Sequence, residues 1–190
     1  MKNIKIILVD DHIVLRNGLK LLLESEQNIS IVGEASSYSE LKAILQQTPT
    51  DILLLDLSIP DKHGLEIIKE LKDSNVNFKI LVFTMHSEEQ YIKSAMSAGA
   101  SGYVEKSAVD TELLTAINTV AQGNIYLNSK NALLMVNSLL NTTETNDPYA
   151  LFSNRELEVM KLMVHGYSLS EIGQRLCLSL KTIDTYKTRI

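Results

Sequence analysis

Three carboxylates stand directly after two apolar runs of the chain. The run Ile4-Lys-Ile-Ile-Leu-Val9 leads into Asp10 and Asp11, and the run Ile52-Leu-Leu-Leu55 leads into Asp56. Near-continuous Ile, Leu and Val is typical of parallel strands that are buried on both faces. Because the carboxyl ends of parallel strands form the edge where ligands bind, we expect the three carboxylates to meet there. Their mutual repulsion calls for a cation.

Four more residues are predicted at the same edge, and each offers a different group. Thr84 ends a later apolar run with a hydroxyl, and Lys106 follows the next run with an ammonium. Tyr103 lies within that last run. Ser58, two residues after Asp56, can present a backbone carbonyl.

A small, hard cation suits this set of oxygen donors. Mg²⁺, or Mn²⁺ in its place, would take Asp11, Asp56 and the carbonyl of Ser58 and would keep several waters. Asp10 would hold one of those waters rather than touch the metal. The four histidines share no metal-ligand spacing and are predicted to be surface or loop residues.

With the cation in place, Asp56 could attack a phosphoryl donor and form an acyl phosphate. The metal, Lys106 and Thr84 would neutralise the equatorial oxygens as negative charge spreads over them. Each of these residues alone is more commonly structural, because an Asp after a strand is often a turn former and a Lys there is often solvated. Their joint placement at strand ends is what favours phosphoryl chemistry.

The first part of the chain alternates between short β-rich runs and amphipathic stretches with helical spacing. Strands are predicted over residues 5–9, 30–34, 52–55, 80–84 and 102–104. Helices between them include residues 14–23 and 65–71. Five βα units in this order predict a doubly wound α/β domain with a parallel sheet, right-handed crossovers and helices on both faces.

After Gly123 this alternation stops. A short helix could form over residues 131–140, and the polar segment that ends at Pro148 is typical of a linker. We therefore predict a first domain over residues 1–123, a linker over 124–150 and a small all-α domain over 151–190.

The last part of the chain is helical in pattern throughout, with helices predicted over residues 153–164, 168–176 and 179–190. Ser153 followed by Glu156 is a capping-box pattern. Gly166 is predicted to end the first of these helices in the left-handed conformation.

Composition and charge limit the kinds of function that this chain could have. Residues 1–150 hold 12 Lys and Arg against 19 Asp and Glu, a net charge of −7, whereas residues 151–190 hold 6 against 4, a net of +2. The first part would repel a polyanion and the last part would tolerate one. No apolar stretch is long enough to span a membrane, and no signal pattern opens the chain. The single cysteine, Cys177, fits the reducing cytoplasm.

The two last predicted helices suggest a helix-turn-helix. Ile183, Tyr186 and Ile190 form an inward stripe, and Ser179 would cap the second helix. Its outward residues would meet DNA phosphates and base edges, with Asp184 accepting from cytosine N4. The candidate DNA contacts are Lys181, Thr182, Asp184, Thr185, Lys187, Thr188 and Arg189. The pattern alone fits a helical dimerisation bundle equally well.

The first part of the chain resembles the receiver domain of two-component response regulators. The resemblance rests on Val9-Asp10-Asp11, on Leu55-Asp56-Leu-Ser58-Ile-Pro-Asp-Lys-His-Gly64, on Thr84 and on Tyr103-Val-Glu-Lys106. It implies a flavodoxin-like, five-stranded sheet of order 2-1-3-4-5 and phosphotransfer to Asp56 from a sensor histidine kinase. Tyr103 would be the switch residue that turns inward with Thr84, and residues 88–121 would form the output surface.

The last part is similar to the LuxR-type DNA-binding domain. The similarity rests on three stretches: Phe152 to Val159, Gly166 to Ile172 and Leu176 to Thr185. Together the two halves resemble the NarL/FixJ class of response regulators. Asp184 departs from that family, which often has Lys there, and should weaken phosphate attraction. The resemblance also implies that the chain stops inside the recognition helix, as a truncated domain.

The leading hypothesis is a phosphorylation-switched transcription regulator that binds promoter DNA as a homodimer when Asp56 is phosphorylated. It would not be an enzyme beyond its own phosphorylation and dephosphorylation, and no membrane partner is expected. One alternative is a phosphatase or phosphotransferase with Asp56 as nucleophile, although Ser58 stands where such enzymes need an acid. Another is a ligand-sensing LuxR-type regulator without phosphorylation.

Overall fold

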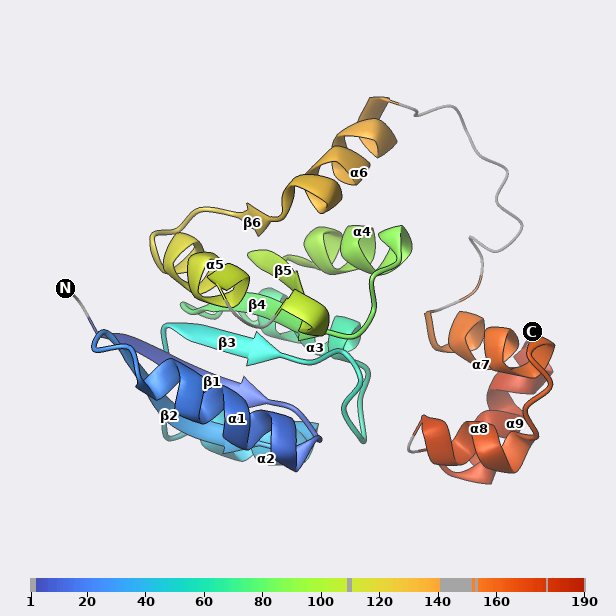
Figure 1. The fold of residues 1–190 in the computed structure, drawn as a ribbon. Coiled ribbons are helices and arrows are strands. Elements are labelled where there is room, and N and C mark those ends of the chain that lie inside the picture. Colours follow the sequence, from blue (N-terminus) through green and yellow to red (C-terminus); the bar gives the residue numbers. More distant parts are fainter. Residues whose placement is uncertain (1–2, 109–110, 141–151, 153, 177, 190) are drawn as a thin grey trace. The chain divides into compact units, whose positions relative to one another are not determined.

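The computed structural model describes residues 3–108, 111–140, 152, 154–176 and 178–189 (Figure 1). The chain forms two compact units, Met1–Leu140 and Asn141–Ile190. Within the described residues, no helix is long and apolar enough to cross a membrane.

The first unit contains a parallel sheet of order β2-β1-β3-β4-β5-β6. Its strands are β1 Ile4–Val9, β2 Ile29–Ala35, β3 Ile52–Leu55, β4 Lys79–Thr84, β5 Gly102–Glu105 and β6 Tyr126–Leu127. The predicted order of the first five strands is confirmed, but the predicted count of five was wrong. Two residues are too short a run to show a strand period, so β6 left no signal in the sequence.

β6 extends the sheet beyond β5, where Gly102 pairs with Tyr126. A Cβ on Gly102 would lie 2.9 Å from Leu81 Cδ1 and 3.0 Å from the Tyr126 carbonyl oxygen. The absence of a side chain at this position therefore lets β5 fit between its two neighbours.

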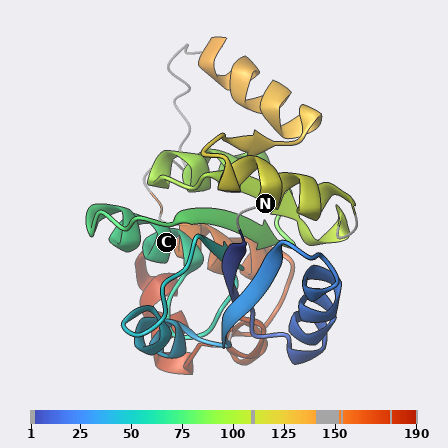
Figure 2. The ribbon, with the colours of Figure 1, turned by 90° about the vertical axis from the view of Figure 1, so that its left-hand side faces the viewer.

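Helices cover both faces of the sheet, as the pattern predicted (Figure 1). The first-unit helices are α1 Ile13–Glu24, α2 Tyr38–Leu45, α3 Gly64–Asp73, α4 Glu89–Ala98, α5 Thr111–Ala121 and α6 Ser129–Leu140. Alternate residues of each strand pack into two separate cores, because successive side chains of a strand point to opposite faces of the sheet. Figure 2 shows α1, in blue, beside the sheet, on the face that it shares with α5. The opposite core contains residues of α2, α3 and α4.

Residues 124–140, which were predicted as part of the linker with a short helix, form β6 and α6. Leu134 and Met135 of α6 pack partly buried against the core that α4 shares. The rest of the predicted linker, residues 141–150, lies outside the described residues.

The second unit is helical, with α7 Asn154–Val164, α8 Leu169–Arg175 and α9 Leu180–Arg189. One buried residue from each helix, Val159, Ile172 and Ile183, makes its core. Gly166 has φ +84°, as expected for a left-handed stop after α7. The predicted Ser153 cap and the last residue of the predicted stripe, Ile190, lie outside the described residues.

Capping residues fix the starts of α8 and α9. Ser168 and Glu171 form a reciprocal capping box at α8, which the sequence reasoning missed although the Ser-x-x-Glu signal was present. At α9, the Ser179 hydroxyl accepts the Thr182 N–H at 3.2 Å, as predicted. A Cβ on Gly173 would lie 2.9 Å from the Leu178 carbonyl oxygen, so glycine permits the tight turn between these helices.

Candidate functional sites

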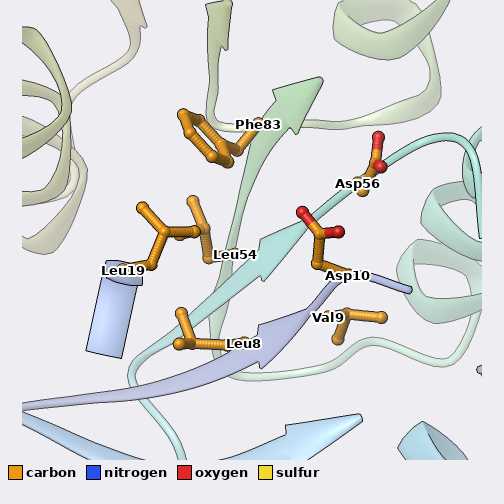
Figure 3. Close-up of a pocket in the computed structure, with 7 residues that line it drawn as sticks. All are labelled: Leu8, Val9, Asp10, Leu19, Leu54, Asp56 and Phe83. Atoms are coloured by element: carbon orange, nitrogen blue, oxygen red, sulfur yellow. The ribbon is translucent and has the colours of Figure 1, made fainter. Parts of the chain in front are cut away.

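The carboxyl ends of β1 and β3 bring two buried carboxylates together (Figure 3). Asp10 and Asp56 are each 3% exposed, and both line the same small pocket. Lys106, the first residue after β5, is also buried. Its Nζ lies 2.6 Å from Asp56 Oδ2 and 2.7 Å from Asp10 Oδ2. The structure therefore joins three of the predicted site residues in one ion-paired group.

The charge of Lys106 is held in place by these carboxylates. Burial alone would lower its pKa, but Asp56 and Asp10 more than offset that effect, so the pKa lies above the ordinary value of 10.5. Lys106 is therefore a fixed positive charge at neutral pH. One ammonium faces three carboxylates with Asp11 counted, which leaves the group with negative charge to be neutralised.

Asp11 is partly buried and adjoins the pair through His12. His12 Nδ1 lies 2.8 Å from Asp11 Oδ1, and one potential ligand atom from each of Asp10, Asp11, His12 and Asp56 lies within 4.8 Å of the others. That spacing lets one ion touch several of these atoms. His12 was predicted only as a surface or loop residue, and it is an exposed loop residue. Its position directly after two acids was the signal for its place here.

The loop after β3 holds Asp56 from the other side. The Ser58 N–H donates to Asp56 Oδ1 at 3.2 Å, so the two oxygens of the Asp56 carboxylate are bound by different groups. Gly64 begins α3 against this loop. A Cβ there would lie 2.5 Å from Leu57 Cα and 3.1 Å from the Asp56 carbonyl oxygen. Because residue 64 is a glycine, α3 can begin in direct contact with the loop that follows Asp56.

His63 was predicted to be a surface or loop residue. It lies in the loop before α3, but its side chain is buried at 4% exposure. Its Nδ1 accepts the Leu65 N–H at 3.2 Å and so caps α3. The sequence gives little sign of this role because His is not a common helix cap.

Thr84 is the last residue of β4 and Tyr103 lies in the adjacent strand β5, and both are fully buried. The Tyr103 hydroxyl donates to the backbone carbonyl of His86 at 2.8 Å. The His86 N–H points to Thr84 Oγ1 at 3.5 Å, a long contact. Burial, followed by the charges of Glu88, Glu105 and Asp56, raises the pKa of Tyr103, so it is a neutral donor.

His86 is the functional candidate that sequence reasoning missed. Its Nε2 lies 3.0 Å from Ser58 Oγ, which links the loop after β4 to the loop after β3. Nothing in the spacing of the sequence predicts a contact across 28 residues.

In the second unit, α9 presents the polar face that was predicted to meet DNA. The exposed polar residues of α9 are Lys181, Asp184, Thr185, Lys187, Thr188 and Arg189. Thr182 is half-buried and bonds back to Ser179 through its hydroxyl. The hydroxyls of Thr185 and Thr188 donate to helix carbonyls at 2.9 and 2.8 Å, so they can only accept from a base or water.

Fold and sites together define a two-part regulator: an α/β domain with an acidic cluster at its sheet edge, and a helix-turn-helix. Residues 6–118 match the response regulator receiver domain, and residues 150–190 match the bacterial regulatory proteins of the luxR family. The chain therefore belongs to the response regulators, in the NarL/FixJ class of DNA-binding regulators with a receiver and a LuxR-type domain.

Curated relatives match over nearly the full length. The oxygen regulatory protein NreC of Staphylococcus carnosus (strain TM300) is 35% identical over 192 residues, which cover 98% of this chain and 88% of that protein. NreC of Staphylococcus aureus (strain MRSA252) is 36% identical with the same coverage.

Solved structures agree with this assignment. The RcsB response regulator of Salmonella typhimurium superposes with a TM-score of 0.70 at 26% identity, covering 100% of this chain and 90% of that one. A LuxR-family two-component response regulator from Aurantimonas sp. SI85-9A1 gives 0.68 at 32% identity, covering 73% and 99%. A further structure, with a TM-score of 0.67 at 27% identity and covering 99% and 90%, shows two RcsB dimers bound to two parallel DNAs.

Proposed function

We propose that Asp56 accepts a phosphoryl group from a sensor histidine kinase and thereby controls DNA binding by the second unit. The observation that carries this proposal is the buried Asp56 carboxylate, held between the Ser58 N–H and the Lys106 ammonium beside Asp10. A buried nucleophile with a fixed cation at its side is suited to receive a group whose oxygens carry negative charge.

Mg²⁺, or Mn²⁺, is the cation that we assign to this site. The fit is supported by the close spacing of the ligand atoms of Asp10, Asp11 and Asp56 and by their excess negative charge. Asp11, Asp56 and the Ser58 carbonyl would hold the ion, and Asp10 would hold one of its waters. When bound, the metal would neutralise charge on the phosphoryl oxygens.

The residues of the chain divide the reaction among them. A carboxylate oxygen of Asp56 forms the new bond to phosphorus while the bond from phosphorus to the donor nitrogen of the kinase histidine breaks. Lys106 then shifts from pairing two carboxylates to pairing the phosphoryl oxygens. Thr84 would donate its hydroxyl to another of these oxygens, and Tyr103 would report that movement.

The acceptor is proposed to act stoichiometrically rather than as an enzyme with turnover. Phosphatases with an Asp nucleophile need an acid two residues later, and here that residue is Ser58, whose hydroxyl contacts His86. We expect only self-phosphorylation and slow self-dephosphorylation.

Phosphorylation is proposed to favour a homodimer that binds promoter DNA through α9, in the cytoplasm. Support comes from the exposed Lys181, Lys187 and Arg189 on α9 and from the RcsB dimers bound to DNA in a related structure. In two-fold symmetric binding, each α9 would enter the major groove of one half-site.

Intact mass spectrometry tests the central step. The protein is incubated with acetyl phosphate and Mg²⁺, and one added phosphoryl group is expected. Asp56→Asn should abolish the addition, whereas Asp73→Asn, at an exposed position that ends α3, should retain it. Labelling that survives Asp56→Asn would refute the acceptor assignment. Labelling of Asp56 would in turn exclude the regulator that senses only a ligand.

A further inference from the structure

His86 joins the two loops that flank Asp56. Its Nε2 lies 3.0 Å from Ser58 Oγ in the loop after β3, although the two residues are 28 positions apart. The backbone of Ser58 is itself bound to Asp56 through the N–H. The ring of His86 therefore contacts Ser58, the residue whose N–H binds the Asp56 carboxylate.

The same ring stacks on α4. His86 and Tyr91 have centroids 4.1 Å apart and planes 19° apart, and Tyr91 is 1% exposed. His63, at the far end of the loop that carries Ser58, lies 6.4 Å from Tyr91 in a similar orientation. One residue from the loop after β3, His63, and one from the loop after β4, His86, therefore lie against the same buried ring of α4.

The backbone of His86 is tied to the two remaining groups. Its carbonyl accepts from the Tyr103 hydroxyl at 2.8 Å, and its N–H faces Thr84 Oγ1 at 3.5 Å. A movement of Thr84 toward Asp56 would therefore also move the backbone of His86, two residues later in the chain. That movement would strain both the contact with Ser58 and the bond from Tyr103.

We propose that His86 is a positioning residue that couples the charge on Asp56 to the conformation of α4, through its hydrogen bond to Ser58 and its stacking on Tyr91. This inference rests on the proposed phosphorylation of Asp56 and adds a route by which it is transmitted. Phosphorylation replaces the single negative charge of the Asp56 carboxylate with a phosphoryl group that carries about two negative charges at neutral pH, and its oxygens attract the Thr84 hydroxyl. The hydrogen bond to Ser58 holds the loop after β4 in one position while Asp56 is unphosphorylated. When phosphorylation moves this loop, the stacking of His86 on Tyr91 would shift α4 to a second position.

Three variants distinguish the hydrogen bond between His86 and Ser58 from the stacking of His86 on Tyr91. His86→Phe keeps an aromatic ring to stack on Tyr91 and removes the hydrogen bond to Ser58. Ser58→Ala removes the same bond from the other side and leaves the His86 ring intact. Met85→Ala is the matched control, because Met85 is the exposed neighbour of His86 in the same loop.

Two measurements are made on each variant of the chain. Intact mass after acetyl phosphate and Mg²⁺ gives the fraction phosphorylated. Hydrogen exchange of the α4 amides is compared with and without phosphorylation, per phosphorylated molecule, with β2 as the internal reference. In the wild type, the exchange of α4 should change about fivefold or more on phosphorylation, the size of an ordinary coupling between two sites.

His86→Phe and Ser58→Ala should each reduce that change to less than half, and the double variant should do no more than either alone. Met85→Ala should respond like the wild type. A wild-type response of α4 in phosphorylated His86→Phe would overturn the proposal. Loss of phosphoryl uptake in His86→Phe would also overturn it, because His86 would then serve the transfer itself. Absence of phosphorylation in the wild type would instead refute the proposed function.

Discussion

Lys106 Nζ lies 2.6 Å from Asp56 Oδ2, and both side chains are 3% exposed. The same ammonium also pairs with Asp10 at 2.7 Å. A single ammonium thus pairs with two buried carboxylates at the ends of neighbouring strands. Since a buried charge that loses its partner is costly, this pairing matters for stability as well as for the proposed chemistry.

Lys106→Met should destabilise the first unit by about 3 kcal/mol in the absence of divalent cations, because two buried carboxylates lose their partner. Addition of Mg²⁺ should recover more stability in this variant than in the wild type, since the ion would replace the missing charge. Urea unfolding with EDTA or with Mg²⁺ measures both effects. An unchanged midpoint in EDTA would show that the ion pair contributes little. Lys79→Met, at an exposed strand start, is the control.

Alkaline pH should weaken the fold through the same residue. The pKa of Lys106 is raised above 10.5 in the folded protein, so the folded state keeps a proton that the unfolded state has lost. The stability from this group is fully present below pH 10.5 and is lost as pH rises through the folded-state pKa. The free energy of unfolding should fall there by up to about 1.4 kcal/mol per pH unit for each such proton. Lys106→Met should show a shallower fall in urea unfolding; an equal slope would contradict the assignment.

Two glycines should respond to alanine in opposite directions. Gly64→Ala places a Cβ 2.5 Å from Leu57 Cα, a backbone atom that cannot move aside, and should both destabilise the fold and impair phosphorylation. Gly18→Ala meets nothing within 4 Å inside α1 and should stabilise the fold by about 0.5 to 1 kcal/mol. Thermal unfolding and intact mass after acetyl phosphate compare the two. Normal phosphorylation of Gly64→Ala would show that the loop tolerates displacement.

The sequence predicted the sheet and much of the acidic site for one physical reason. Buried parallel strands read as apolar runs, and the residues after them must share an edge, so Asp10, Asp56 and Lys106 could be placed together. His86 and β6 could not be found this way. A contact across 28 residues depends on how two loops settle on α4, and a two-residue strand has no measurable period.

In the second unit, too, the sequence predicted some features and not others. Ile183 was placed inward by helical spacing, and Ser179 as a cap by its position before the helix. The buried pair of Arg155 with Glu158, at 2.7 Å, carries no such signal, because a charged pair at i and i+3 normally lies on the solvated face. Its burial follows from the packing of three short helices around a very small core.

Asp184 should limit the affinity of α9 for DNA. Its carboxylate is exposed between Lys181 and Lys187 on the face that we propose to meet the phosphates. Asp184→Asn removes a repulsive charge and should tighten binding to nonspecific duplex DNA, whereas Lys187→Ala should weaken it at every sequence. Fluorescence anisotropy over a range of salt concentrations measures both, with Lys161→Ala on exposed α7 surface as the control.

The salt dependence separates the roles of these two side chains. Lys187→Ala should reduce the slope of log affinity against log salt by about one, as expected for one lost phosphate contact. Asp184→Asn should tighten binding without that loss of slope and should relax any preference for cytosine at one position of a selected site. If Asp184→Asn left both affinity and base preference unchanged, Asp184 would lie outside the DNA interface, and α9 would have to meet DNA on another face.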